Sequence, residues 1–289
     1  MASSVHELNA LQSQLMAWRH EGLTIGFVPT MGGLHDGHCS LMRQATRRCD
    51  RLVVSIFVNP TQFAEGEDLE AYPRDAERDL ALATSAGADL VWFPKLEDIY
   101  PKGWCSTLVP GGVGLGLETD HRPHFFTGVA TVVARLFALV RPQLAVFGEK
   151  DYQQLLVVRQ VNEDLCFGVE VLAGKLVRDH DGLALSSRNV YLSADARIDA
   201  QAVPRALAGV CAAYAQGERS VSQLEAAGVN ELRATGLEME YCRIVSAEDL
   251  SAPPERVSEQ GDRWRLVIAA RCHGIRLIDN CALDGPPWR

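Results

Sequence analysis

Strongly apolar runs alternate with amphipathic segments over the first 176 residues of the chain. The apolar runs have the length of buried strands and end at turn-forming residues; they cover residues 23–28, 51–58, 89–93, 144–147 and 169–173. The segments with a helical spacing of apolar residues cover 5–18, 38–49, 75–86, 128–140 and 150–163. Buried strands that alternate with helices predict a parallel sheet with helices on both faces, a Rossmann-like α/β fold.

The pattern changes after residue 176. An Ala-rich helix is predicted over 195–216 and a second helix near 221–235. Strands are predicted at 238–245, 263–270 and 274–283. Because strands and helices no longer alternate, we expect a Rossmann-like domain over residues 1–176 and a smaller C-terminal α+β domain over residues 177–289.

Composition excludes several classes of protein. The formal net charge of -9 argues against a nucleic-acid surface, which needs an excess of Lys and Arg. No apolar stretch approaches the roughly 18 residues of a membrane span, and no signal peptide is predicted. The eight cysteines are scattered without a CxxC pair, so we expect reduced core thiols in a cytoplasmic protein.

Chemistry-bearing residues follow three of the predicted strands. The segments are PTMGGLHDGH from Pro29, NPTQF from Asn59 and GEKDYQQ from Gly148. Ligands of parallel α/β sheets collect beyond the carboxyl ends of the strands. We therefore expect these three loops to form one crevice.

The first of these loops has the pattern of a phosphate site. His35 and His38 stand one helical turn apart at the start of a predicted helix, where backbone N–H groups favour anions. Gly32, Gly33 and Gly37 allow a ligand to approach the backbone closely. Histidines are also common as surface or hydrogen-bonded core residues, and a zinc site is the weaker reading because no third ligand has a recognisable spacing.

The second and third loops admit two interpretations each. Asn59 and Gln62 either satisfy backbone groups of a turn or bind a substrate carboxylate or hydroxyl. Lys150 either pairs with its acidic neighbours or reaches a phosphate, and Gln154 would face the same crevice one turn later.

Two further segments contain polar or glycine-rich patterns. Ser186, Ser187 and Arg188 read either as the end of a hairpin or as a phosphate clamp. The segment GGVGLGLE (111–118) lacks the GK[ST] of a phosphate loop and the strand-then-helix frame of a dinucleotide site, so we predict an ordinary loop there.

Taken together and in order, the motifs of the chain resemble those of one family. They are PTMGGLHDGH, SIFVNPTQF, YPRD, RPxxFxGV, FGEKDYQQ, LSSRN and RLIDN. This combination is similar to the pantothenate synthetases, the pantoate–β-alanine ligases of the HxGH nucleotidyltransferase superfamily, over nearly the whole chain. The HxGH pattern alone would also fit other nucleotidyltransferases and class I aminoacyl-tRNA synthetases.

The resemblance implies a reaction and its participants. ATP would activate the carboxylate of pantoate as pantoyl adenylate with release of pyrophosphate, and the amine of β-alanine would then displace AMP. The enzyme would be a homodimer whose first domain binds ATP and pantoate and whose C-terminal domain acts as a lid. Mg²⁺ would bridge the phosphates with few protein ligands, which the sequence does not identify. Charge stabilisation would carry the catalysis, without a protein nucleophile.

The resemblance also assigns roles residue by residue. His38 would donate a hydrogen bond or proton to the departing phosphates, and the charge would be shared by His35, Lys150, Ser186, Ser187 and Arg188. Asn59, Gln62 and Gln154 would bind pantoate, with Gln62 also near the incoming β-alanine, and Val177 would line the adenine pocket. The ATP-binding set is Met31, Gly32, His35, Gly37, His38, Gly148, Lys150, Asp151, Val177, Leu185, Ser186, Ser187 and Arg188.

Some positions depart from the family pattern. Thr119 stands in the place of a common glycine and Phe125 in that of a common histidine, with His124 one residue earlier. Thr61 replaces a common methionine, a mild change in an apolar contact. Two alternatives stay open: a nucleotidyltransferase acting on another small acceptor, and a nucleotide-binding relative that has lost turnover through the altered loop.

Overall fold

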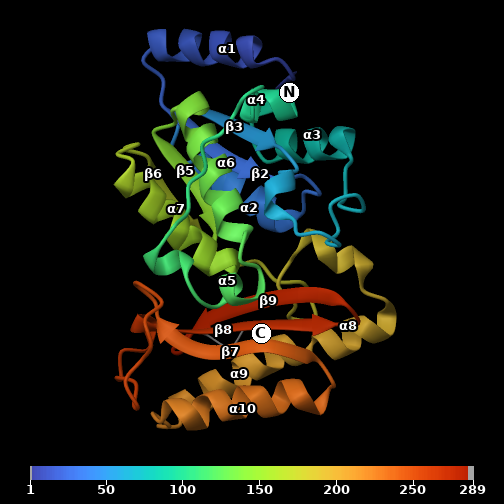
Figure 1. Cartoon of the computed structure of the whole chain (residues 1–289), viewed down its shortest axis with the longest axis vertical. Helices are drawn as coiled ribbons and strands as arrows, with labels where there is room; N and C mark the ends of the chain where they lie inside the picture. Colours follow the sequence, from blue (N-terminus) through green and yellow to red (C-terminus); the bar gives the residue numbers. More distant parts are fainter. Residues whose placement is uncertain (1, 286–289) are drawn as a thin grey trace. The chain divides into compact units, whose positions relative to one another are not determined.

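The computed structural model describes residues 2–285, which fold into two compact units (Figure 1). The first unit comprises the residues up to Glu149 together with Gln153–Leu176. The second comprises Lys150–Tyr152 and the residues from Val177 onward. The sequence did not predict that the three residues Lys150–Tyr152 belong to the second unit.

The first unit is built on a parallel sheet of order β1-β4-β3-β2-β5-β6. Its strands are β1 (Ser3–Val5), β2 (Ile25–Thr30), β3 (Arg51–Ile56), β4 (Leu90–Trp92), β5 (Leu144–Gly148) and β6 (Glu170–Gly174). The helices are α1 (Leu8–His20), α2 (Asp36–Ala45), α3 (Ala76–Ser85), α4 (Leu96–Ile99), α5 (Glu118–His121), α6 (Phe125–Val140) and α7 (Tyr152–Asp164). Short 3₁₀ turns are η1 (Pro60–Gln62), η2 (Gly112–Gly114) and η3 (Glu149–Asp151).

Helices cover both faces of this sheet. Under α2 and α3, Met42 and Ala83 pack into one core with Val146 of β5. Successive strand residues point to opposite faces, so the neighbouring Phe147 faces the other side. There its ring meets Phe137 of α6 edge-on, with 6.2 Å between the ring centroids. The predicted Rossmann-like architecture is confirmed.

The start of the chain differs from the prediction. Val5 was expected in the first helix, but it belongs to strand β1 and pairs with Trp92 of β4 in parallel. The helix begins only at Leu8. A three-residue edge strand is too short to show a period of its own, so Val5 was absorbed into the helical pattern that follows it.

The second unit is a small α+β structure, as predicted. An antiparallel sheet of order β7-β8-β9 packs against helices on one face (Figure 1). Its elements are η4 (Ser187–Tyr191), α8 (Ala194–Ala200), α9 (Ala202–Ala215), α10 (Val221–Ala234), β7 (Glu238–Ser246), η5 (Gly261–Arg263), β8 (Trp264–Cys272) and β9 (Ile275–Ala282). The predicted helix over 195–216 is two helices that meet at Gln201, because Pro204 occupies the first turn of α9, where no backbone N–H is needed.

Two other expectations concern the whole chain. None of the helices between residues 2 and 285 has the length and hydropathy that crossing a membrane requires. The cysteines are unpaired thiols, but they are not all in the core, since Cys105 and Cys166 are exposed. Burial raises the pKa of the Cys242 thiol to about 12.

Candidate nucleotide and substrate site

The loop after β2 is held in a conformation that only glycines adopt readily. Gly32 and Gly33 have φ values of +85° and +60°. The buried carboxylate of Asp79 on α3 accepts hydrogen bonds from the backbone N–H groups of Gly33 (2.9 Å) and Leu34 (2.8 Å). A Cβ atom on Gly32 would lie only 3.0 Å from Asp79 Oδ2. Asp79 belongs to no sequence motif, and its place among the apolar positions of α3 was the only signal for it.

The two histidines of this loop present matching hydrogen-bond donors. Nδ1 of His35 accepts the backbone N–H of Gly37 at 3.1 Å, and Nδ1 of His38 accepts the backbone N–H of His35 at 3.3 Å. Because a nitrogen that accepts carries no proton, each ring in its neutral form would hold its proton on Nε2. The ring centroids are 4.1 Å apart and the ring planes are tilted by 40°, so the two imidazoles lie side by side at the start of α2.

The strand order explains why this loop is the natural ligand site. From β2 the chain proceeds to β3 and β4 on one side and then returns to β5 on the other. The reversal point lies between β2 and β5, where open α/β sheets bind ligands. Met31 follows β2 directly and Gly148 ends β5, so both flank this point within the first unit.

The loop after β3 gathers a network of side chains. Asn59, which is 1% exposed, caps η1, and its Nδ2 donates to Gln62 Oε1 at 3.1 Å. Tyr100, at the end of α4, donates its hydroxyl to Asn59 Oδ1 at 2.9 Å. Gly128 of α6 packs so closely here that a Cβ on it would meet the Thr61 carbonyl oxygen at 2.5 Å. Asn59 thus satisfies a backbone group of the turn, as one of the two interpretations predicted, and it also bonds to Gln62. Tyr100 joins the pair without a sequence signal.

The departures from the family pattern have a structural account. Arg122 donates to both carboxylate oxygens of Glu67 at 2.8 Å and to the backbone oxygen of Gln62 at 3.0 Å. The ring of Phe125 lies 4.0 Å from the Arg122 guanidinium in a cation–π contact. Burial raises the pKa of Glu67, but the hydrogen bonds and charge of Arg122 outweigh burial and hold it below its usual value. Phe125 therefore supports the arginine that fastens the Gln62 loop.

The other two altered positions contribute differently. Thr119 donates its hydroxyl to the carbonyl oxygen of Gly114. The His124 side chain has its Nε2 atom buried without a hydrogen-bond partner among residues 2–285. The structure therefore gives Thr119 a role in closing the loop and gives His124 none.

Adjacent glutamines on α7 have separate environments. Gln153 is buried, and its Nε2 donates to the carbonyl oxygens of Val113 (3.0 Å) and Gly116 (3.2 Å). This side chain holds the glycine-rich segment, which is a loop with one 3₁₀ turn, as predicted. Gln154 is half-buried and makes no hydrogen bond from its side chain to another residue of the described range.

Lys150 and its neighbours are positioned within the second unit. The backbone oxygen of Lys150 accepts a hydrogen bond from Asn280 Nδ2 at 2.9 Å. Its ammonium lies 3.5 Å from Asp151 Oδ1, a long contact between partly exposed groups. Tyr152 is held by a hydrogen bond to the Ala247 carbonyl oxygen and by the Arg265 guanidinium, which lies 3.8 Å from its ring centroid. Asn280, the last residue of the RLIDN segment, thus holds the backbone of Lys150.

The serine and arginine candidates follow a short hairpin. Leu185 N–H donates to the Val177 carbonyl oxygen at 2.9 Å, and Ser186 Oγ caps η4 by accepting the Arg188 N–H. Ser187 and Arg188 lie in the same 3₁₀ turn. Residues 185–188 therefore follow directly after the end of the hairpin, which hydrogen bonds hold in place. This is what one of the two interpretations of the sequence predicted.

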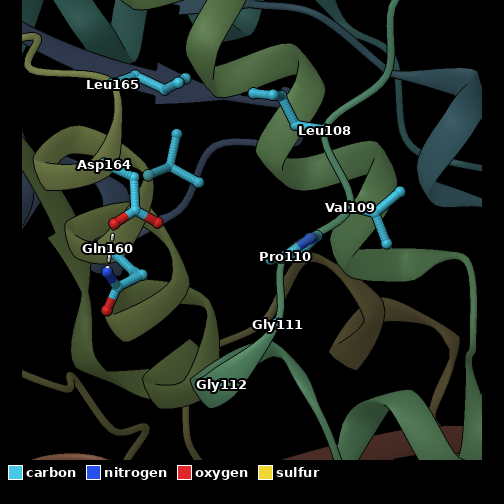
Figure 2. A pocket seen from close by; sticks show the side chains of 9 residues that line it. Leu108, Val109, Pro110, Gly111, Gly112, Gln160, Asp164 and Leu165 are labelled. Carbon is cyan, nitrogen blue, oxygen red and sulfur yellow. Dashed lines mark hydrogen bonds between the residues drawn. The ribbon is translucent and has the colours of Figure 1, made fainter.

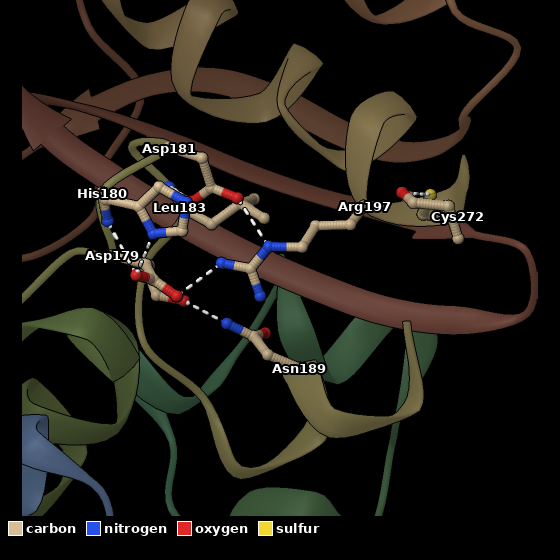
Figure 3. A network of polar contacts seen from close by, with 9 residues as sticks. Asp179, His180, Asp181, Leu183, Asn189, Arg197 and Cys272 are labelled. Carbon is tan, nitrogen blue, oxygen red and sulfur yellow. Dashed lines mark hydrogen bonds and ion pairs between the residues drawn. The ribbon is translucent and has the colours of Figure 1, made fainter. Parts of the chain in front are cut away.

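Two ion-pair networks hold this hairpin. At its base, Arg178 donates two hydrogen bonds to the carboxylate of Asp279. Asp279 is a buried residue, 3% exposed. At its tip, Arg197 of α8 donates to Asp179 and to Asp181 (Figure 3). Hydrogen bonds from His180 and the nearby Arg197 lower the pKa of Asp179 to about 2.

The first unit has a cavity away from the strand-end loops, and the described residues form no metal cluster. Within residues 2–285 there is no cluster of three or more His, Cys, Asp or Glu side chains able to hold a metal ion. A cavity of about 430 Å³ lies between residues 108–112 and Gln160–Leu165, at the C-terminal end of α7 (Figure 2). This end of α7 leads back to the start of β6, so the cavity is not formed by the strand-end loops.

The fold and these loops define a nucleotide-binding α/β protein of the HxGH type. A family model described as pantoate-beta-alanine ligase matches residues 3–282. A curated "Pantothenate synthetase" of Bradyrhizobium sp. is 48% identical over 277 residues, which are 96% of each chain. A solved pantothenate synthetase from Thermus thermophilus has a TM-score of 0.91 at 46% identity and covers 98% of this chain and 99% of that one. The chain belongs to the pantoate–β-alanine ligase family.

A second solved relative was described with ligands. It is a pantoate-beta-alanine ligase from Francisella tularensis, complexed with "Beta-gamma ATP and Beta-alanine". Its TM-score is 0.80 at 28% identity, and the match covers 100% of both chains. The whole length of the present chain is therefore represented in ligases of this family.

Proposed function

We propose the route by which this chain, a pantoate–β-alanine ligase that uses ATP, joins its substrates. A carboxylate oxygen of pantoate attacks the α-phosphorus of ATP, the bond from that phosphorus to the bridging oxygen breaks, and pyrophosphate leaves. The amine of β-alanine then attacks the acyl carbon of pantoyl adenylate, AMP leaves with the electron pair of the broken C–O bond, and the amine loses a proton. No protein nucleophile is needed in either step.

The observation that best supports this proposal is that the His35 and His38 rings are held in the same way, each by a backbone N–H that donates to Nδ1. With Nδ1 of each ring accepting a backbone N–H, Nε2 of each would be the donor to phosphate oxygens at the N-terminus of α2, where the helix dipole also favours negative charge. As the bond to the leaving phosphate breaks, charge grows on these oxygens, and donors fixed in advance stabilise it. Met31, Gly32, Gly37 and Gly148 would leave room for the nucleotide beside the switch point.

Residues of the second unit supply further donors. We assign Lys150, Ser186, Ser187 and Arg188 to the phosphates, because an ammonium, two hydroxyls and a guanidinium suit oxyanions. Asp151, Val177 and Leu185 complete the ATP set, with Val177 assigned to adenine. The hydrogen bond from Asn280 to the Lys150 carbonyl fixes the backbone from which the lysine extends.

Pantoate binding is assigned to Asn59, Gln62 and Gln154. Asn59 and Gln62 form one hydrogen-bonded pair, and Gln154 has a half-buried amide not engaged by another described residue. Amides suit a ligand with a carboxylate and two hydroxyls because they donate and accept.

Mg²⁺ fits this set of residues only as an ion carried mainly by the phosphates. The described residues offer no cage of three protein ligands, and both oxygens of Asp79 already accept backbone N–H groups. Bound there, the cation would neutralise phosphate charge.

A homodimer in the cytoplasm remains part of the proposal. Val109 and Leu165, beside the cavity of the first unit, are 77% and 44% exposed, and a second copy would remove such apolar surface from water. Sedimentation of the protein and of Val109→Asp tests this: a dimer that the charge dissociates supports it, and a wild-type monomer contradicts it.

The adenylate route is tested by isotope exchange. With ATP, Mg²⁺ and pantoate but no β-alanine, the protein should exchange labelled pyrophosphate into ATP, and omission of pantoate should abolish the exchange. If the folded protein binds ATP and forms pantothenate but does not catalyse this exchange, the pantoyl-adenylate intermediate is ruled out.

A further inference from the structure

The orientation of the Asn59 amide is fixed by two backbone groups. The Thr61 N–H donates to Oδ1 at 3.3 Å, and Nδ2 donates to the Gly128 carbonyl oxygen at 3.3 Å. A backbone N–H can only donate and a carbonyl oxygen can only accept. Exchanging the oxygen and nitrogen of this buried amide would therefore break both hydrogen bonds.

Two hydroxyls strengthen this orientation. Tyr100 donates to Asn59 Oδ1 at 2.9 Å, and the Thr61 hydroxyl donates to the same oxygen at 3.0 Å. The two hydroxyl oxygens are 3.3 Å apart. Burial raises the pKa of Tyr100, so its hydroxyl keeps its proton and remains a donor. Asn59 Oδ1 is thus surrounded by donors.

Asn59 passes this orientation on to Gln62. Asn59 Nδ2 donates to Gln62 Oε1 at 3.1 Å, which commits the oxygen of Gln62 to the protein. The backbone of Gln62 is fastened at the same time by Arg122. Its Nε2 donates to no other side chain or backbone group between residues 2 and 285, so its two N–H groups are available to a ligand.

The Gln62 amide therefore selects ligand groups by whether they accept or donate hydrogen bonds. A ligand atom at Gln62 Nε2 must be an acceptor, such as a carboxylate or hydroxyl oxygen. An ammonium group, which has only donors, finds no partner there. Pantoate offers acceptors, whereas the protonated amine of β-alanine does not.

We propose that Tyr100 and Thr61 are positioning residues that act through Asn59 to hold the Gln62 amide with its N–H groups toward the substrate acid. The proposal rests on the assignment of Gln62 to pantoate. It also gives a function to Thr61, whose hydroxyl a methionine at this position would lack.

The test is a double-mutant cycle on steady-state kinetics. Tyr100→Phe combined with Thr61→Val removes both hydroxyls and keeps the side-chain shapes. We expect KM for pantoate to rise on the order of 10-fold, as for the loss of about one hydrogen bond, with KM for ATP unchanged. In a Gln62→Ala background the same two substitutions should have no further effect on KM for pantoate.

Controls separate this proposal from the assignment of Gln62. Thr46→Val removes an exposed hydroxyl that bonds only to the Arg43 carbonyl oxygen, and it should leave both KM values unchanged. If Gln62→Ala leaves KM for pantoate unchanged, the assignment of Gln62 to pantoate is wrong. If Gln62→Ala raises KM but the effect of the hydroxyl variants is additive, or KM for ATP rises equally, the positioning role is wrong while the assignment stands.

A polarity reversal provides an independent measurement. Asn59→Asp replaces the donor to Gln62 with a carboxylate, which would turn the Gln62 N–H groups toward itself. We expect a larger rise in KM for pantoate than with Asn59→Ala, and thermal unfolding checks that both variants are folded. An equal rise for the two variants in folded protein would contradict the proposal.

Discussion

Oδ1 of Asp79 lies 2.8 Å from the backbone nitrogen of Leu34, 45 residues earlier in the chain, and accepts its hydrogen bond. Its second oxygen does the same for Gly33. A single carboxylate on α3 thereby fixes the path of the loop that ends in His35 and His38. The proposed phosphate donors His35 and His38 thus depend on a residue whose carboxylate bonds, among the described residues, only to the backbone of their loop.

Replacing this carboxylate should damage the loop. Asp79→Asn places an NH₂ group against one of two backbone N–H donors, so we expect a loss of roughly 1–3 kcal/mol in the free energy of unfolding. KM for ATP should also rise. Urea unfolding and kinetics check both, with Asp75→Asn as the matched control, because Asn caps a helix as well as Asp does. Equal behaviour of the two variants would contradict the role of Asp79.

The cationic and histidine donors should matter for turnover more than for folding. His38→Ala and Lys150→Ala are each expected to lower kcat on the order of 10² to 10³, the loss of one donor to a developing charge. His20→Ala, an exposed histidine at the end of α1, serves as the control. A folded His38→Ala or Lys150→Ala variant with a near-normal rate would show that its assignment is wrong.

Close packing of α6 on η1 gives a prediction with an internal control. Gly128→Ala brings a Cβ within 2.5 Å of the Thr61 carbonyl oxygen, so η1 must shift and both stability and pantoate binding should fall. Gly209→Ala on α9 has no atom within 4 Å of its Cβ and should be neutral or stabilising. Thermal unfolding and KM for pantoate distinguish them; similar results for both would refute the packing argument.

The hairpin tip should show a specific pH dependence. The pKa of Asp179 is about 2 in the folded protein, below its ordinary value of 3.8. Its carboxylate therefore stabilises the fold fully above about pH 4 and loses this effect as the pH falls toward 2. Asp179→Asn should be less stable than wild type near pH 6, by a small margin since the group is partly exposed, and the difference should vanish near pH 2. A constant difference across this range in urea unfolding would exclude the shift.

The sequence predicted the parallel sheet because its buried strands are continuous apolar runs, which tertiary context rarely overrides. It also placed Asn59 and Gln62 directly after one of these strands, where the structure has them. Asp79 and Tyr100 were not found, because each contacts residues about 40 or more positions away and neither belongs to a recognisable motif. Long-range hydrogen bonds of this kind leave no period in the chain.

The sequence also could not predict which atoms of the site donate hydrogen bonds and which accept them. The letters of His35 and His38 predict imidazoles near phosphates, but the proton on Nε2 follows from backbone N–H groups that meet Nδ1 only in the folded loop. Likewise, Thr61 was predicted as a mild change in an apolar contact, yet its hydroxyl joins a hydrogen-bond network, and that part of the prediction is wrong.

The three residues Lys150–Tyr152 belong to the second unit although the first unit's chain surrounds them on both sides. A protein ending at Leu176 would retain these residues but lose Asn280 and Arg265, which hold them in place. The gene therefore has no single junction at which the halves could be separated, exchanged or fused to other domains without leaving the lysine's anchor behind.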